Sequence, residues 1–115
     1  MSLDRLLAAA SDLLDDKIMA EGPAHLMRIR VEKIHEEAGE VEAAMIGVEG
    51  SNPRKGSTHT LDDLEGELLD VALTALLAFY HVSRSAPVAS FERHAIDKIE
   101  RYYGITLESL DGLTP

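Results

Sequence analysis

The sequence lacks cysteine altogether and has few aromatic residues. Its 115 residues include no Cys, three Tyr and two Phe. The absence of cysteine excludes disulfides, thiolate metal sites and cysteine nucleophiles, and it is compatible with the reducing cytoplasm, where we expect the protein to reside. With few aromatics and no alternating hydrophobicity, no segment is typical of a β-strand.

Positive charge is also scarce. Eleven Lys and Arg face 21 Asp and Glu, for a formal net charge of −10. We therefore expect neither a nucleic acid nor a membrane as partner, because both present negative charge. Asp4, Arg5 and Asp12 interrupt the apolar N-terminal stretch, so it does not resemble a signal peptide. No run approaches the roughly 18 apolar residues of a membrane span.

Hydrophobic residues recur at helical spacing in four segments that Gly and Pro separate. The predicted helices run from about Leu3 to Met19, Ala24 to Ile46, Leu61 to Val82 and Pro87 to Tyr103. We expect Gly47 to cap the second helix and Thr60 to begin the third. The length indicates one domain over residues 1–115, with a short turn or frayed residues in the tail 105–115.

Four helices predict an all-α bundle. The segment 66–82 is apolar nearly all round, and the first helix has a broad apolar face. A helix that is hydrophobic on every side must be central in a larger structure. We therefore predict that oligomerisation completes the bundle, as a symmetric homodimer or a larger assembly.

Two acidic residues interrupt the most apolar helix. Glu67 and Asp70 are three residues apart, which places them on one helix face about 5–6 Å from each other. Acidic side chains are rarely buried unless they are paired or coordinate a metal. This pair is therefore a candidate for metal binding, although acidic pairs on helices are commonly just solvated.

A second acidic pair lies on the preceding helix. Glu37 and Glu40 have the same spacing and flank an apolar stripe; alone, they are more typical of a solvated face. If the two helices pack antiparallel, all four carboxylates converge, and like charges disfavour ionisation. A hard divalent cation resolves that conflict, and oxygen ligands suit Mg²⁺ or Mn²⁺.

These acids also carry a family pattern. The sequence has EEAGE over residues 36–40, an insert of 26 residues, and ELLD over residues 67–70. This order of EExxE and ExxD, with the flanks KIHEEAGEVEAA and GELLDVALTALLA, resembles the MazG-like all-α nucleoside triphosphate pyrophosphohydrolases. The resemblance covers about Ala24 to Tyr103.

The resemblance implies four or five helices assembled as a dimer or tetramer, and cleavage of a (deoxy)nucleoside triphosphate to monophosphate and pyrophosphate. It implies Mg²⁺ as cofactor, with Mn²⁺ as a possible substitute. The implied ligands are Glu37, Glu40, Glu67 and Asp70. Glu36 matches the first acid of EExxE, and the implied role is to orient or deprotonate the attacking water.

A phosphate clamp of basic residues should complete such a site. In the family a basic residue on the last helix commonly faces the phosphates, and FERHAIDKIERYYG resembles that segment. The candidates are Lys98 first, then Arg101, with Lys33 on the second helix. Ordinary surface charge explains these residues equally well.

Three other assignments compete. One is a non-catalytic helical module for regulation or protein interaction. The intact set of acids disfavours it, because such a module would not need them. Another is a di-iron bundle, which uses Glu-x-x-His pairs; only Glu32 with His35 has that spacing. The histidine-pathway relatives of the family carry Tyr-His where this chain has Leu73 and Thr74, which disfavours that role.

Overall fold

The computed structural model describes residues 2–18, 22–50, 54 and 56–110, and they form an all-α structure. Among these residues there are four α-helices, one short 3₁₀ helix and no strand. The elements are α1 (Leu3–Ile18), α2 (Pro23–Glu49), α3 (Leu61–Ser83), α4 (Pro87–Tyr103) and η2 (Glu108–Leu110). The expectation of an all-α fold is confirmed.

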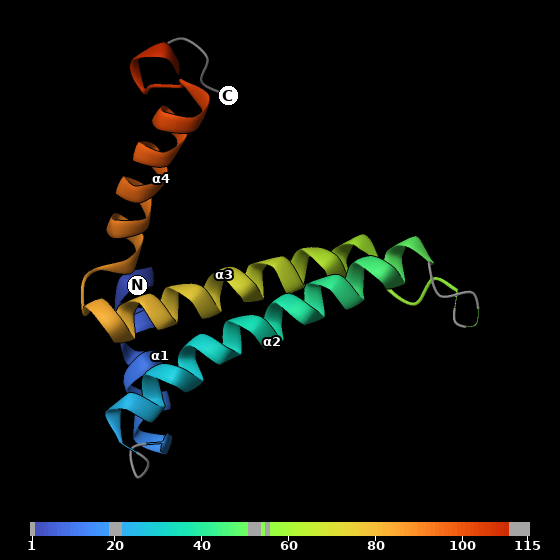
Figure 1. Cartoon of the computed structure of the whole chain (residues 1–115), viewed down its shortest axis with the longest axis horizontal. Helices are drawn as coiled ribbons and strands as arrows, with labels where there is room; N and C mark the ends of the chain where they lie inside the picture. The colour runs from blue at the N-terminus through green and yellow to red at the C-terminus, as the bar shows by residue number, and fades with distance from the viewer. Residues whose placement is uncertain (1, 19–21, 51–53, 55, 111–115) are drawn as a thin grey trace.

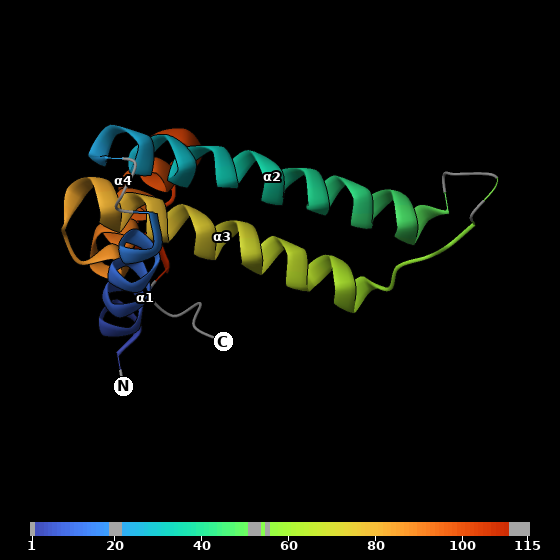
Figure 2. The ribbon, with the colours of Figure 1, turned by 90° about the horizontal axis from the view of Figure 1, so that it is seen from below.

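The chain is an open, L-shaped arrangement built on a helical hairpin. α2 and α3 lie side by side and antiparallel, and α1 packs across the end where α3 finishes (Figures 1 and 2). α4 leaves that end as a separate arm (Figure 1). The radius of gyration is 17.8 Å, whereas a compact domain of this length has about 13 Å.

Local capping explains where α3 and α4 begin. The Thr60 side chain accepts a hydrogen bond from the Asp63 backbone N–H at 3.2 Å, and the Asp63 carboxylate accepts one from the Thr60 N–H at 2.9 Å. This reciprocal pair is a capping box, and it confirms Thr60 as the first residue of the turn into α3. Pro87 opens α4, and Gly104 with φ of 67° ends it.

The predicted end of α2 at Gly47 is wrong. The helix continues to Glu49, and Gly50 is the cap, with φ of 67°. Gly47 is buried inside α2 because the returning loop packs on it: its carbonyl accepts the Thr58 N–H at 3.0 Å. A side chain there would collide with Thr58 and His59, so the glycine serves close packing. The predicted end of the first helix at Met19 lies outside the described residues.

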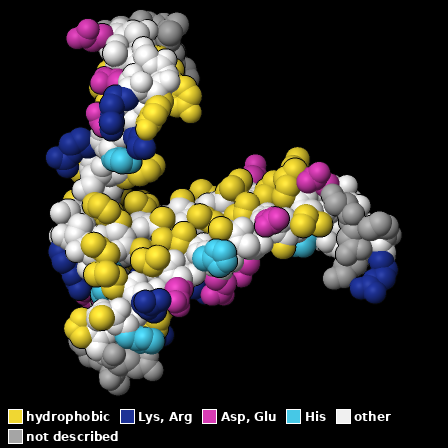
Figure 3. Space-filling view, viewed as in Figure 1, with side chains coloured by type: hydrophobic (Ala, Val, Ile, Leu, Met, Phe, Trp, Pro, Cys, Tyr) yellow, Lys and Arg dark blue, Asp and Glu magenta, His cyan; other side chains and the backbone are white. Residues whose placement is uncertain are grey.

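The core of the single chain is small. Among the described residues, the buried hydrophobic side chains are Leu7, Leu26, Ala44, Ala78 and Pro87. Large apolar residues remain exposed over α3 and the corner it makes with α4, where Figure 3 shows many hydrophobic side chains. The accessible area is 8555 Å², compared with roughly 6,200 Å² for a compact monomer of this mass.

α3 is also long and apolar enough to cross a membrane by length and composition alone. The core helix of a water-soluble assembly meets the same test. Glu67 and Asp70 lie within this helix, and carboxylates at membrane depth are costly. The expectation of no membrane partner therefore stays a prediction.

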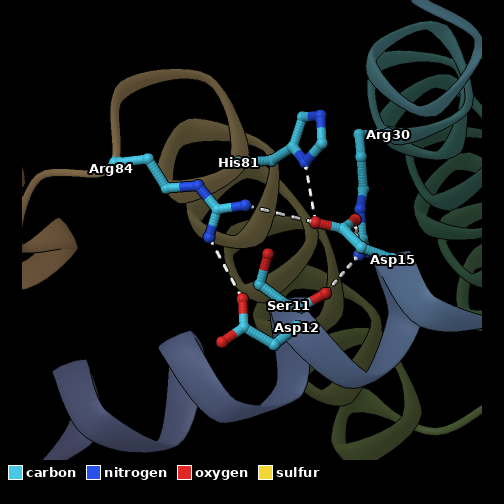
Figure 4. Close-up of polar contacts among 6 residues, drawn as sticks. All are labelled: Ser11, Asp12, Asp15, Arg30, His81 and Arg84. Carbon is cyan, nitrogen blue, oxygen red and sulfur yellow. Dashed lines mark hydrogen bonds and ion pairs between the residues drawn. The ribbon is translucent and has the colours of Figure 1, made fainter. Parts of the chain in front are cut away.

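A charged network fastens α1 to the hairpin (Figure 4). The Asp15 carboxylate, 6% exposed, accepts a hydrogen bond from Arg30 of α2 at 2.8 Å and lies 3.0 Å from Nδ1 of His81 of α3. Arg30 also donates to the Ser11 carbonyl at 3.1 Å. Arg84, just after α3, lies 3.6 Å from Asp15. One carboxylate thus joins three helices.

Burial alone would raise the pKa of Asp15, but hydrogen bonds from Arg30 and His81 and their charges outweigh it and hold the pKa below its ordinary value of 3.8. A carboxyl group whose pKa is lower in the folded state stabilises the fold above its unfolded pKa. That stabilisation is lost as the pH falls through the folded-state pKa. The window for Asp15 therefore lies below about pH 4.

Asp15→Asn should lower the free energy of unfolding by about 3 kcal/mol at pH 7, because removing one partner leaves Arg30 buried without its counter-charge. Urea titrations at a fixed protein concentration measure this. Asp16→Asn, at an exposed neighbouring position, is the control and should change stability by less than about 0.5 kcal/mol. The difference in free energy of unfolding between Asp15→Asn and the unmodified chain should become smaller below about pH 4. Equal stability of both variants at pH 7 would contradict this role.

Candidate metal centre

Three carboxylates converge between α2 and α3. Glu37 of α2 and Glu67 and Asp70 of α3 each offer one oxygen, and these oxygens lie within 4.8 Å of one another. The two helices come from segments separated by a loop, and their antiparallel packing brings the two acidic motifs to the same level of the hairpin (Figure 2). The expected convergence is therefore present for three of the four predicted ligands.

Helix periodicity explains why these acids face inward. Glu67, Val71, Thr74 and Ala78 follow one another at intervals of three or four residues, so they share one face of α3. Ala78 is buried on that face, and the other three are half-buried. Glu67 therefore occupies a position in the row that packs against α2, where an apolar residue would ordinarily lie.

The carboxylates of the cluster are not all neutralised by positive side chains of the protein. The Oε2 atom of Glu67 is buried and has no hydrogen-bond partner. Burial raises the pKa of Glu37, and the nearby charge of Glu40, a hydrogen bond with Glu40 and the charge of Asp70 raise it further. Leaving a buried carboxylate oxygen unpaired is costly, so this set of atoms is suited to a ligand that brings positive charge.

Oxygen-only ligands of this kind fit Mg²⁺ or Mn²⁺. Glu37, Glu67 and Asp70 would supply three carboxylate oxygens, and the unpartnered Glu67 oxygen gives the fit a physical reason. Mg²⁺ commonly keeps waters and adds phosphate oxygens to a small number of carboxylates. A cluster of three acids, of which Asp70 is exposed, leaves room for both.

Glu40, the fourth predicted ligand, lies at the edge of the cluster. It is exposed and is not one of the three converging acids, although it is close enough to Glu37 to affect its pKa. Its role as a ligand stays a prediction. Glu36 is also exposed and accepts a hydrogen bond from Lys33 at 3.0 Å.

Of the three predicted phosphate-binding cations, Lys33 lies at the cluster. Its Nζ atom is 3.7 Å from a Glu37 oxygen. On α4, Lys98 lies 4.9 Å from the centre of the Tyr102 ring, and Arg101 donates a hydrogen bond to the Asp97 carboxylate. That helix leads away from the α2–α3 hairpin (Figure 1), so the structure of one chain does not bring Lys98 and Arg101 to the acids.

Sequence reasoning missed Arg30, which is 8% exposed and linked to Asp15. A signal for it was present in the sequence. Asp15 follows Leu7 and Ser11 at intervals of four, and Arg30 follows Leu26 at the same interval, so both occupy positions in the inward rows of their helices. Opposite charges at inward positions of consecutive helices indicate a buried pair.

Comparison with known proteins adds no relative: no protein-family model, no curated protein and no solved structure matches this chain. The assignment of the site therefore depends on its own geometry.

Glu67→Gln should weaken Mn²⁺ binding by at least about tenfold, since even residues that only support metal ligands change affinity by that much. Titration monitored by the electron paramagnetic resonance signal of free Mn²⁺ measures the effect. Glu42→Gln, which removes the same charge at an exposed position of α2, should bind as the unmodified protein does. Unchanged affinity in Glu67→Gln would exclude this residue as a ligand.

Proposed function

We propose that this protein is a Mg²⁺-dependent nucleotide pyrophosphohydrolase that cleaves a nucleoside triphosphate to the monophosphate and pyrophosphate. The observation that supports it best is the convergence of Glu37, Glu67 and Asp70 around a buried carboxylate oxygen without a partner. The resemblance of EEAGE and ELLD to the MazG-like motifs supplies the reaction. A three-carboxylate site suits a cation that is shared with substrate phosphates.

Glu37, Glu67 and Asp70 would hold Mg²⁺, which would supply positive charge against the negative charge that develops during hydrolysis. Glu37, Glu67 and Asp70 would fix its position on two rigid helices. Water would attack as the α–β anhydride bond breaks, with pyrophosphate leaving and one proton released from the water. Positioning by a rigid scaffold is the main contribution a protein makes to phosphoryl transfer.

Lys33 and Glu36 are placed to assist. Lys33 pairs with both Glu36 and Glu37, so its ammonium group lies beside the acids and would bind a substrate phosphate there. Glu36 is exposed on the same helix and would orient the attacking water. Both roles are part of the proposal.

We also propose that the chain assembles as a homodimer or homotetramer. Leu69 is 70% exposed and Phe91 60% exposed, and apolar surface of this extent usually marks an interface. The accessible area is larger than that of a compact monomer by an amount that an obligate interface would cover. In such an assembly Lys98 and Arg101 could reach the acids of a second copy.

A non-catalytic helical module is the second candidate. It would use the same exposed apolar surface for a partner protein and would have no need for the acid cluster. The unpartnered Glu67 oxygen disfavours it, because a buried carboxylate without a function is a cost. A di-iron centre is disfavoured by the ligand set, since no His is among the converging residues.

Purified protein with Mg²⁺ should release pyrophosphate and monophosphate from a subset of a panel that contains the common NTPs, dNTPs and dUTP. Glu67→Gln and Asp70→Asn should each lose at least about a hundredfold in kcat/KM, because the loss of charge stabilisation at a reacting phosphate costs about 2.7 kcal/mol or more. Glu42→Gln should retain activity.

Two outcomes separate the candidates. Absence of pyrophosphate from every nucleotide, in folded protein that binds Mn²⁺, would leave a metal site with another reaction and overturn the proposal. Absence of both turnover and metal binding would favour the non-catalytic module.

The oligomer has its own test. Leu69→Glu and Phe91→Glu should each reduce the assembly to a smaller species in light scattering coupled to size-exclusion chromatography. In a monomer, these substitutions at exposed positions would change the free energy of unfolding by no more than about 0.5 kcal/mol. Ala43→Glu adds the same charge at an exposed position of α2 and should leave the assembly intact. A monomer of the unmodified chain would refute the assembly.

A further inference from the structure

α4 carries an apolar stripe that its own chain leaves largely uncovered. Phe91, Ala95, Ile99 and Tyr102 follow one another at intervals of three or four residues, so they share one face of the helix, the α4 stripe. Phe91 is 60% exposed and Tyr102 69% exposed. Most of the stability of a helix in a protein comes from packing such a face, so the α4 stripe requires a surface to cover it.

The corner between α3 and α4 is held in place by α1. Pro87 is buried, and the backbone N–H of Val88 donates a hydrogen bond to the Asp4 carboxylate at 2.8 Å. Arg84, in the turn between the two helices, donates one to the Asp12 carboxylate at 3.1 Å. These contacts fix the start of α4, and from there the helix leads away from its own hairpin (Figure 1).

α3 carries a matching stripe on the same corner. Leu68, Ala72, Ala75 and Phe79 also recur at intervals of three or four residues and are exposed, and we call them the α3 stripe. At the corner, three of these residues line a cavity of about 420 Å³ whose walls also include Phe91. Figure 3 shows hydrophobic side chains over both helices on one face of the molecule.

The two stripes have equal spacing along their helices. Positions are counted back from Ser83, where α3 ends, and forward from Pro87, where α4 begins. At four, eight and fifteen residues from these ends lie the pairs Phe79 with Phe91, Ala75 with Ala95, and Leu68 with Tyr102. At 1.5 Å per residue these pairs are roughly 6, 12 and 22 Å from the corner.

We propose that two copies of this chain pack about a two-fold axis through the corner, so that the α4 stripe of each copy lies antiparallel on the α3 stripe of the other. This inference rests on the proposed assembly and names the surfaces that form it. A two-fold axis makes every contact occur twice with the roles of the copies exchanged. Because paired residues are equally far from the corner, both stripes are covered in one register.

Charge favours α4, rather than a second α3, as the helix that covers the α3 stripe. α3 contains five acidic residues and no Lys or Arg, whereas α4 contains three acidic and three basic residues. Two α3 helices side by side would bring like charges together, which is unfavourable across an interface. α4 brings Lys and Arg side chains and no net negative charge to a strongly acidic helix.

The accessible area of the chain leaves room for this contact. It exceeds the area of a compact monomer of this mass by roughly 2,300 Å². A stable interface buries about 800 Å² on each partner, and obligate dimers bury more. The pairing of α4 with α3 therefore gives this surplus a use in both copies.

The test introduces pairs of cysteines into a chain that has none of its own. In the double variant Ala75→Cys/Ala95→Cys, both thiols lie roughly 12 Å from the corner on helices that lead apart, too far apart for a disulfide within one chain. Mild oxidation should therefore produce a covalent dimer on a non-reducing denaturing gel. It should form at least about tenfold faster than in either single variant, because assembly gives the thiols a high effective concentration.

Two further double variants check the register. Leu68→Cys/Tyr102→Cys should cross-link as fast as the first pair, and it does not depend on the same substitutions. Leu68→Cys/Ala95→Cys is the matched control, because its positions differ by roughly 10 Å in distance from the corner. Its thiols are beyond the reach of a disulfide, so it should cross-link no faster than the single variants.

Light scattering on the same samples separates this inference from the assembly proposal. A dimer in which the matched pairs cross-link no faster than the offset pair would overturn the α3–α4 pairing and leave the assembly standing. Rapid cross-linking of Ala75→Cys alone would show that two α3 helices face each other and would also overturn the pairing. A monomer of the unmodified chain would overturn both.

Discussion

The buried carboxylate of Asp15 determines how this chain closes. Burial removes this carboxylate from water, and contacts with Arg30, His81 and Arg84 offset the lost hydration. Its partners lie on or next to α2 and α3, so the charge is compensated only when α1, α2 and α3 meet in this arrangement. Apolar contact alone would allow α1 to slide or rotate on the hairpin, because hydrophobic attraction has no direction. The charged contacts select one position, and in that position Leu14 of α1 supplies part of the wall of a hollow that Lys33 also lines.

The chain holds two acidic sites with opposite electrostatic outcomes, one around Asp15 of α1 and one around Glu37 of α2. At Asp15 the surrounding cations lower the pKa, and the charge is balanced within the chain. At Glu37 burial and neighbouring acids raise the pKa, and the buried Glu67 oxygen is left unpaired. Proteins retain such unfavourable groups mainly where function requires them. This contrast within one small molecule supports the proposal that a cation binds at the second site.

α3 separates two kinds of surface. The face that includes Glu67 and Thr74 is turned toward α2 and the proposed substrate. Leu69 lies on the opposite face and is exposed, as is the apolar surface at the corner between α3 and α4. Assembly through the outer face would cover that apolar surface without filling the inner one. It would also give a reason for the open, L-shaped chain, since an isolated chain gains little core from its fourth helix (Figure 1).

The sequence by itself determined the helical class and most helix ends, because periodicity, Thr60, Pro87 and Gly104 act through neighbouring backbone groups. It also determined that the acids come in pairs three residues apart. Only the tertiary structure decided which of them meet, and that Glu40 lies at the edge and Lys98 on another arm. It also decided that Gly47 lies inside a helix and that Arg30 lines a hollow. Those outcomes depend on the rotation and offset of one helix against another, which are set by contacts between residues distant in the chain and leave no local pattern.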